Sequence, residues 1–143
     1  MHFTTLGYSR PDGQTSDHWD NVAKLQWEPE FFKYVRDSFA PVGLCIDFWD
    51  EQIPAGKKVR VPVIVSNDLD QWWTGSVILR LKNEHQVVAS LVQTCRLKPL
   101  GQDTVDFELT WPEQGGPWRL EAEMRGPCGT VRSVREPDLA RQP

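Results

Sequence analysis

Seven tryptophans stand out in this chain of 143 residues, and an indole ring can stack on a sugar or fill a protein core. Trp72 and Trp73 are adjacent, so their side chains point to opposite faces if the segment is an extended strand. We expect Trp73 to lie in the core and Trp72 to lie outside it. Trp49 also falls on an outward position, so Trp49 and Trp72 are the residues that we predict to contact a sugar or a neighbouring domain.

The three histidines do not indicate a catalytic or metal site. His2, His18 and His85 lie far apart, and none has the spacing of a ligand pair. His18 lies near Asp17 and Asp20, but in a stretch that has the composition of a loop. A catalytic triad needs a nucleophile, a base and an orienting group, and the chain also lacks a glycine-rich phosphate loop. We therefore predict no catalytic residue, no metal site and no cofactor.

The three cysteines, Cys45, Cys95 and Cys128, are odd in number and widely spaced. This arrangement does not indicate a disulfide framework. We expect them to be small buried hydrophobic residues. A single disulfide bridge, either Cys45–Cys128 or Cys45–Cys95, is the alternative that the sequence does not exclude.

The overall composition excludes several classes of partner. The formal net charge is −4, from 16 basic and 20 acidic residues, so we expect no nucleic-acid partner. No apolar run reaches the roughly 18 residues that span a membrane, so we expect no membrane partner either. The first residues lack the basic and apolar regions of a signal peptide. If the parent protein is periplasmic or secreted, its signal lies elsewhere or has been removed.

Residues 1–39 differ in pattern from the rest of the chain. The stretch SRPDGQTSDHWD has no alternation and predicts a loop with a turn at Pro11-Asp12-Gly13. The following segment, WEPEFFKYVRDSF, predicts a short helix, because Pro29 suits a first helical turn and apolar residues recur every four positions from Phe31 to Phe39. Pro41 would end that helix. We interpret residues 1–39 as a linker from a preceding domain.

From Pro41 onward the apolar period changes to two, which indicates strands. About seven short segments alternate in this way, with turn signals between them and no helical segment long enough for a parallel crossover. We therefore predict an all-β fold, an immunoglobulin or fibronectin-III-like antiparallel sandwich over residues 40–136, with a tail at 137–143. Pro62 cannot donate to a β-ladder, so its part of the second strand should be an edge or a bulge. The predicted strands are 42–48, 59–65, 73–81, 85–97, 105–111, 118–124 and 128–136.

Residues 25–135 resemble the immunoglobulin-like β-sandwich domains of glycoside hydrolase family 2 enzymes, the β-galactosidase, β-glucuronidase and β-mannosidase group. The resemblance lies in a helix followed by Ala-Pro, then an Ala-Gly turn, a valine strand, an Asn-Asp-Leu turn and a Trp-x-Gly opening of the next strand. The residues that carry it are Ala40-Pro41, Ala55-Gly56, Asn67, Asp68, Leu69, Trp73 and Gly75. Independently of the resemblance, Asn67 can hydrogen-bond a turn backbone, and Gly75 leaves room for the Trp73 ring.

The resemblance implies a non-catalytic accessory domain that supports or spaces a catalytic barrel. Enzymes of this family use two glutamates on a barrel of about 250 residues, which this chain is too short to contain. The glutamates between Glu108 and Glu123 alternate with core residues, so we expect them on the solvated face of strands. The implied partner is the barrel of the same parent protein. The residues expected to dock against it or to line its cleft are Trp19, Trp27, Phe31 and Phe32, and the wider apolar patch would add Phe39 and Trp49.

Two other functions fit the same sequence. A carbohydrate-binding module would need a line of exposed aromatic residues, which Trp49, Trp72 and Trp111 could supply. A protein-interaction or adhesion domain is equally compatible with the fold, because a fold does not by itself assign a function.

Overall fold

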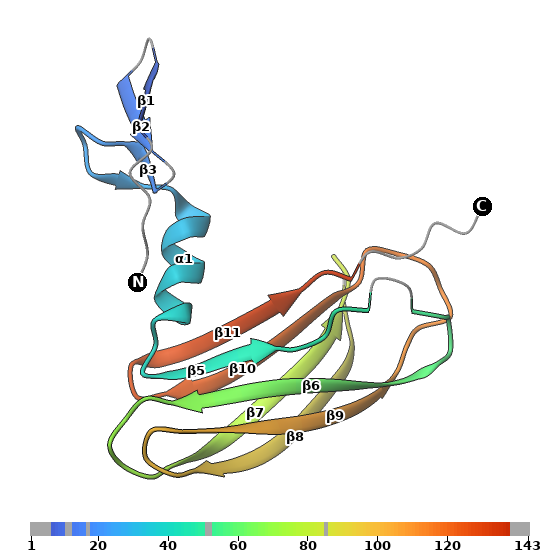
Figure 1. Cartoon of the computed structure of the whole chain (residues 1–143). Coiled ribbons are helices and arrows are strands. Elements are labelled where there is room, and N and C mark those ends of the chain that lie inside the picture. Colours follow the sequence, from blue (N-terminus) through green and yellow to red (C-terminus); the bar gives the residue numbers. More distant parts are fainter. Residues whose placement is uncertain (1–6, 11–12, 17, 51–52, 85, 138–143) are drawn as a thin grey trace. The chain divides into compact units, whose positions relative to one another are not determined.

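The computed structural model describes the whole chain except residues 1–6, 11–12, 17, 51–52, 85 and 138–143. The chain divides into two compact units, residues 1–39 and residues 40–143. Figure 1 shows the elements of both units, which we describe separately. No helix in the described part of the chain has the length and apolar character that a membrane span requires.

The first unit contains more regular structure than the loop that we predicted. Four short strands form an antiparallel sheet in the order β1-β2-β3-β4. They are β1 (Gly7–Arg10), β2 (Gly13–Ser16), β3 (Trp19–Asn21) and β4 (Gln26–Trp27). The prediction of a loop was wrong for these residues, because backbone pairing of two to four residues leaves no apolar alternation in the sequence.

Helix α1 (Pro29–Ser38) follows β4, as the pattern predicted. Pro29 occupies its first turn, where a missing N–H costs nothing. Glu28 caps the helix, and its carboxylate accepts hydrogen bonds from the N–H groups of Glu30 and Phe31. A carboxylate at this position also interacts favourably with the positive end of the helix dipole.

The second unit is an all-β antiparallel sandwich of two sheets, as predicted (Figure 1). One sheet has four strands in the order β11-β10-β7-β8, and the other has three in the order β5-β6-β9. The seven strands are β5 (Val42–Ile46), β6 (Lys58–Asn67), β7 (Trp73–Lys82), β8 (Val87–Leu97), β9 (Gly101–Thr110), β10 (Arg119–Gly126) and β11 (Gly129–Arg135). The register of β7 and β8 shifts between Leu81, which faces Ala89, and Lys82, which faces Val87.

Alternate residues of both sheets point inward and form one core. On β6 the buried apolar positions are Val61, Val63 and Val65, and on β10 they include Leu120 and Ala122. This is the period of two on which the strand prediction rested. All buried apolar residues of the described chain lie between residues 42 and 131.

Pro62 lies on a part of β6 that has a strand on one side only. The pairing of β5 with β6 ends at Ile46 and Val63, whereas β6 continues beside β9 as far as Lys58. The carbonyl of Pro62 accepts a hydrogen bond from the Asp47 N–H, at 2.9 Å, on the side where β5 has ended. In a β-strand, the N–H and the carbonyl of one residue point to the same side. The missing N–H of Pro62 would therefore face the β5 side, so its absence does not remove a hydrogen bond between β6 and β9.

Candidate interaction surfaces

Five aromatic rings gather in the first unit, and we call them the aromatic group: His18, Trp19, Trp27, Phe31 and Phe32. Trp19 and Trp27 stack with ring centroids 3.8 Å apart, because β3 and β4 place them opposite each other. Trp27 lies 5.7 Å from Phe31 and 6.3 Å from Phe32, and His18 packs edge-on to Phe31 at 4.0 Å. The structure thus brings together the four residues that we predicted to dock against a barrel or line its cleft.

Much of the aromatic group faces solvent. Trp27 is 41% exposed and Phe32 is 51% exposed, and Leu25 and Phe39 nearby in sequence are also exposed. Among residues 18–39, Asp37 is the single buried residue, and it is polar. Residues 18–39 therefore lack the enclosed apolar core that would normally hold such rings.

Trp49 lies on the surface of the sandwich, just after β5, with 68% of its area exposed. Its indole N–H donates to the carboxylate of Asp47 at 2.6 Å, and the guanidinium of Arg135 lies 3.9 Å from the ring centroid. The cation on one face of the ring fixes its orientation. It also covers a face on which a sugar would otherwise stack.

Trp72 and Trp73 separate as expected. Trp72 is 59% exposed, and the guanidinium of Arg96 lies 4.5 Å from the centroid of its ring. Trp73 is half-buried and packs against the core. Its ring passes so close to Gly75 that a Cβ atom there would collide with the indole atoms Cζ2 and Cη2. The expected role of Gly75, to leave room for this ring, is confirmed.

Trp111 cannot contribute to an exposed aromatic line. It is only 1% exposed, and its ring stacks on Phe48 in the core with centroids 6.5 Å apart. It directly follows β9 and continues the inward positions Phe107 and Leu109. Its expected use as a sugar-contacting residue was wrong for this reason.

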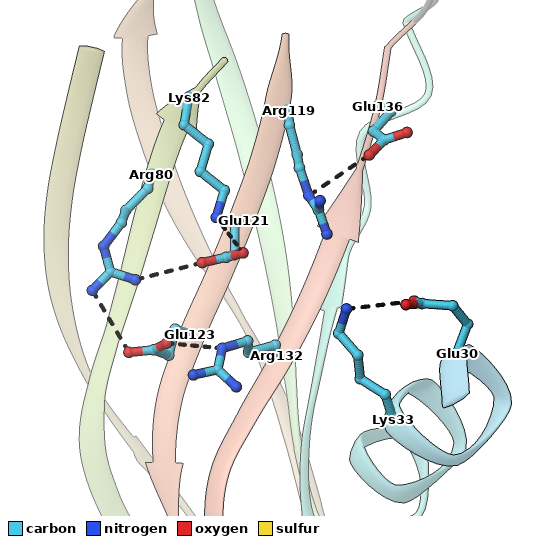
Figure 2. Close-up of polar contacts among 9 residues, drawn as sticks. All are labelled: Glu30, Lys33, Arg80, Lys82, Arg119, Glu121, Glu123, Arg132 and Glu136. Atoms are coloured by element: carbon cyan, nitrogen blue, oxygen red, sulfur yellow. Dashed lines mark hydrogen bonds and ion pairs between the residues drawn. The ribbon is translucent and has the colours of Figure 1, made fainter. Parts of the chain in front are cut away.

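A network of charged side chains crosses the outer face of the four-stranded sheet (Figure 2). Lys82 and Arg80 on β7 face Glu121 on β10, with nitrogen–oxygen distances of 2.6 and 3.8 Å. Arg80 also approaches Glu123 at 3.6 Å, and Arg132 on β11 approaches the same carboxylate at 3.0 Å. The side chain of Glu121 is only 12% exposed. The prediction that these glutamates are simply solvated was therefore incomplete, because long side chains on neighbouring strands cover them.

The electrostatics of this network oppose a role in acid catalysis. Burial by itself would raise the pKa of Glu121, but the hydrogen bond and charge of Lys82, with the charges of Arg119 and Arg132, lower the pKa below its ordinary value. A general acid in a glycosidase needs a carboxyl group whose pKa is raised. The network instead holds Glu121 ionised.

The cysteines differ from their expected burial. Cys45 and Cys128 are exposed and Cys95 is half-buried, and all three are free thiols. Cys45 occupies an outward position of β5 between the inward residues Leu44 and Ile46, which explains its exposure. Burial, with a smaller effect of the Asp103 charge, raises the pKa of Cys95.

No group of three or more His, Cys, Asp or Glu residues that could hold a metal is present among the described residues. His2, Asp17 and His85, which the sequence analysis considered, lie outside them.

Comparison with known proteins identifies the fold. No protein-family model and no curated protein sequence matches the chain. Among solved structures, the chain is similar to part of a cycloisomaltooligosaccharide glucanotransferase from Paenibacillus sp., with a TM-score of 0.51 and 23% identity over 66% of this chain. It is also similar to a superoxide reductase (neelaredoxin) from Ignicoccus hospitalis, with a TM-score of 0.54 and 16% identity over 84% of this chain and 98% of that one.

A β-glucosidase from Listeria innocua matches with a TM-score of 0.47 and 14% identity, over 68% of this chain and 16% of the enzyme. The chain spans only 13% of the length of the glucanotransferase. In the glucanotransferase, a β-domain of this shape therefore forms a small part of a long chain. At these identities the likeness shows the fold alone.

The arginine contacts of Trp49 and Trp72 could not be predicted from the sequence. Arg135 lies 86 positions after Trp49, and Arg96 lies 24 positions after Trp72. Only the strand order and register bring each pair together. The adjacency of Trp72 and Trp73 was informative because it depends on local geometry alone.

Proposed function

We propose that this chain is a non-catalytic β-sandwich domain of a larger sugar-acting enzyme of the glycoside hydrolase family 2 kind. In this role the sandwich, which is of the immunoglobulin-like type, supports or spaces a catalytic barrel. The first unit contacts that barrel through the aromatic group. The domain itself binds no metal and no cofactor.

The observation that carries the proposal is the contrast between the two units. The sandwich encloses a complete apolar core, whereas the first unit displays Trp27, Phe32 and Phe39 to solvent. Contiguous exposed apolar surface marks a site of interaction with another protein or domain. Aromatic side chains such as these supply most of the energy in such interfaces.

The similarity to part of a glucanotransferase is consistent with this role, because there too a β-domain forms a small share of a long chain. The sequence resemblance to family 2 sandwiches adds the order of the elements, a helix leading directly into the first strand of the sandwich.

Binding of the chain to a catalytic barrel tests the proposal directly. The purified chain is immobilised, and a family 2 barrel without its accessory domains is passed over it in surface plasmon resonance. We expect saturable binding that the double substitution Trp27→Ser and Phe32→Ser weakens at least tenfold. Val92→Ser, which removes an exposed apolar side chain from the sandwich, is the matched control and should bind as the unmodified chain does. Equal binding by all variants would contradict the role of the aromatic group.

A hydrolysis assay tests the non-catalytic character. The chain is incubated with 4-nitrophenyl β-galactoside, β-glucuronide and β-mannoside, beside an intact family 2 enzyme. We expect no release of nitrophenol above the rate in buffer. Turnover that persists through repeated purification would overturn this part of the proposal.

Carbohydrate binding is a second candidate, supported by the exposure of Trp49 and Trp72. Each ring has an arginine on one face, so at most the other face of each is open to a sugar. Titration with β-linked oligosaccharides, followed by tryptophan fluorescence, tests it. A response that Trp72→Ala abolishes would favour this function over a purely structural one.

A further inference from the structure

Hydrogen bonds connect two turns at one end of the sandwich, the turn between β6 and β7 and the turn between β8 and β9. The side-chain amide of Asn67 donates to the carbonyls of Gln71 and Lys98, at 2.8 and 3.0 Å. The Leu100 N–H donates to the Leu69 carbonyl at 3.0 Å. The two turns therefore form one continuous surface. We call it the entry end, and it consists of residues 40–41, 67–72 and 98–101.

The chain enters the sandwich from the first unit at this same end. The Asp68 N–H donates to the Pro41 carbonyl at 2.9 Å, and Ala40 packs against the core. Residue 39 is the last residue of the first unit. A domain that precedes the sandwich in the parent protein would therefore be connected to it at the entry end.

Two large apolar side chains, Trp72 and Leu100, are exposed at the entry end. Leu100 is 71% exposed, and its backbone has a positive φ of 50°. Residues with a Cβ atom disfavour this conformation, which glycine and asparagine adopt more readily. The side chain of Leu100 thus gains little burial in a strained backbone position. This combination indicates a contact outside the sandwich.

The surroundings of these two side chains favour a protein as the partner. Exposed charged residues of both signs surround them, namely Asp68, Asp70, Arg96 and Lys98. The two aspartates would oppose anionic lipid headgroups. Leu100 offers a sugar no hydrogen-bonding group. An apolar centre with a polar rim is instead the usual composition of a protein–protein contact.

The size of this surface indicates a partner in the same chain. Two such side chains bury on the order of 300 Å² on their side of a contact. Stable complexes of separate proteins bury at least about 600 Å² on each side, so two copies of the entry end would not form a stable dimer. A domain joined by a short connection needs less area, because its effective concentration is on the order of millimolar.

We propose that the entry end is a second contact surface for the catalytic barrel of the parent protein, with Trp72 and Leu100 at its centre. This inference rests on the proposed function for the barrel itself. It adds a surface on the sandwich to the aromatic group of the first unit. The connection at residues 39–40 cannot set the angle between barrel and sandwich by itself, and a contact at the entry end would fix it.

Binding to the barrel tests the entry end. The full chain is immobilised, and a family 2 barrel without its accessory domains is passed over it in surface plasmon resonance. We expect the double substitution Trp72→Ser and Leu100→Asn to weaken binding about tenfold. Val92→Ser, which removes an exposed apolar side chain from β8, should bind as the unmodified chain does.

Urea denaturation distinguishes a contact surface from a structural role for Leu100. We expect Leu100→Asn to keep or raise the urea midpoint of the chain, because asparagine adopts a positive φ more readily than leucine. A lower midpoint would overturn the proposal, since Leu100 would then serve the fold of this chain.

The binding data also separate this inference from the proposed function. If Trp27→Ser with Phe32→Ser weakens binding and the entry-end variant does not, the entry end has no role and the proposed function stands. If the unmodified chain does not bind the barrel, both proposals are overturned.

Discussion

At the scale of single residues, Gly75 is a position where a side chain is excluded on steric grounds. A methyl group there would collide with the ring of Trp73, which must then leave its place against the core. We predict that Gly75→Ala lowers the free energy of unfolding by about 1–3 kcal/mol, the usual cost of overpacking. Urea denaturation followed by tryptophan fluorescence measures it.

The matched control for this substitution is Gly115→Ala. A Cβ atom at Gly115 meets nothing within 4 Å, and the backbone there is not in the left-handed region. Alanine at such a position restricts the unfolded chain, so stability should stay the same or rise by less than about 1 kcal/mol. If the two variants are equally stable, the contact between Trp73 and position 75 does not constrain the fold.

Asn67 is a second residue whose loss has a definite expected cost. Its amide N–H₂ donates to the carbonyls of Gln71 and Lys98 at 2.8 and 3.0 Å, and its side-chain oxygen accepts from the Leu69 N–H at 3.2 Å. Asn67 is fully buried, so alanine would leave these backbone groups without their partner. We predict that Asn67→Ala costs about 1–3 kcal/mol in thermal or urea unfolding. A change below about 0.5 kcal/mol would show that solvent replaces these bonds.

At the scale of elements, the charged network links β7, β10 and β11 in a pH-dependent way. The pKa of Glu121 in the folded chain is lowered below its ordinary value of 4.5. Its stabilising contribution is therefore present above about pH 4.5 and is lost as the pH falls through the lower pKa of the folded state. We predict that Glu121→Gln lowers the free energy of unfolding on the order of 1 kcal/mol at pH 7. This difference should shrink below pH 4.5.

Glu108→Gln is the control for the network, because Glu108 is 73% exposed and lies 4.0 Å from Lys58. Its unfolding free energy, measured in urea at pH 7 and pH 3, should match that of the unmodified chain. A difference between Glu121→Gln and the unmodified chain that is the same at both pH values would contradict the electrostatic explanation. The loss would then come from packing.

The elements also show how far the sequence alone predicts the structure. The alternation of apolar and polar residues predicted the seven strands. It does so because an inward position such as Val63 is set by the geometry of its own strand and not by the strand beside it. The charged network could not be predicted, because Lys82 and Glu121 meet only through the register of β7 and β10. The strands β1 to β4 were missed, because pairs such as Gly7 with Ser16 depend on backbone hydrogen bonds that no side-chain pattern reports.

The sequence predicts which residues form the candidate site, but it does not predict how their rings are arranged. Trp19, Trp27, Phe31 and Phe32 were chosen because they are large aromatic residues ahead of the sandwich, and the structure does bring them together. The stacking of Trp19 on Trp27 depends on the turn between β3 and β4, where Leu25 has a positive φ of 51°. Such turn conformations in a residue other than glycine are uncommon and are not evident from residue type.

At the scale of the whole molecule, the two units should differ in autonomous stability. Every buried apolar residue of the described chain lies between Val42 and Val131, within the sandwich. Helix α1 has ten residues, fewer than the roughly 12–15 at which an isolated helix becomes even marginally stable in water. We therefore predict that a chain beginning at Ala40 folds cooperatively, with a free energy of unfolding within about 1 kcal/mol of the full chain. A peptide of residues 1–39 should show no cooperative transition.

Urea denaturation monitored by circular dichroism and tryptophan fluorescence checks both fragments. The fluorescence of the shortened chain reports the core through Trp111 and Trp118, which are both buried. A loss of several kcal/mol on removing residues 1–39 would mean that the first unit is an integral part of the sandwich. If the sandwich folds independently of residues 1–39, the rings of the aromatic group contribute little to its stability. The aromatic group is then available to contact an external partner.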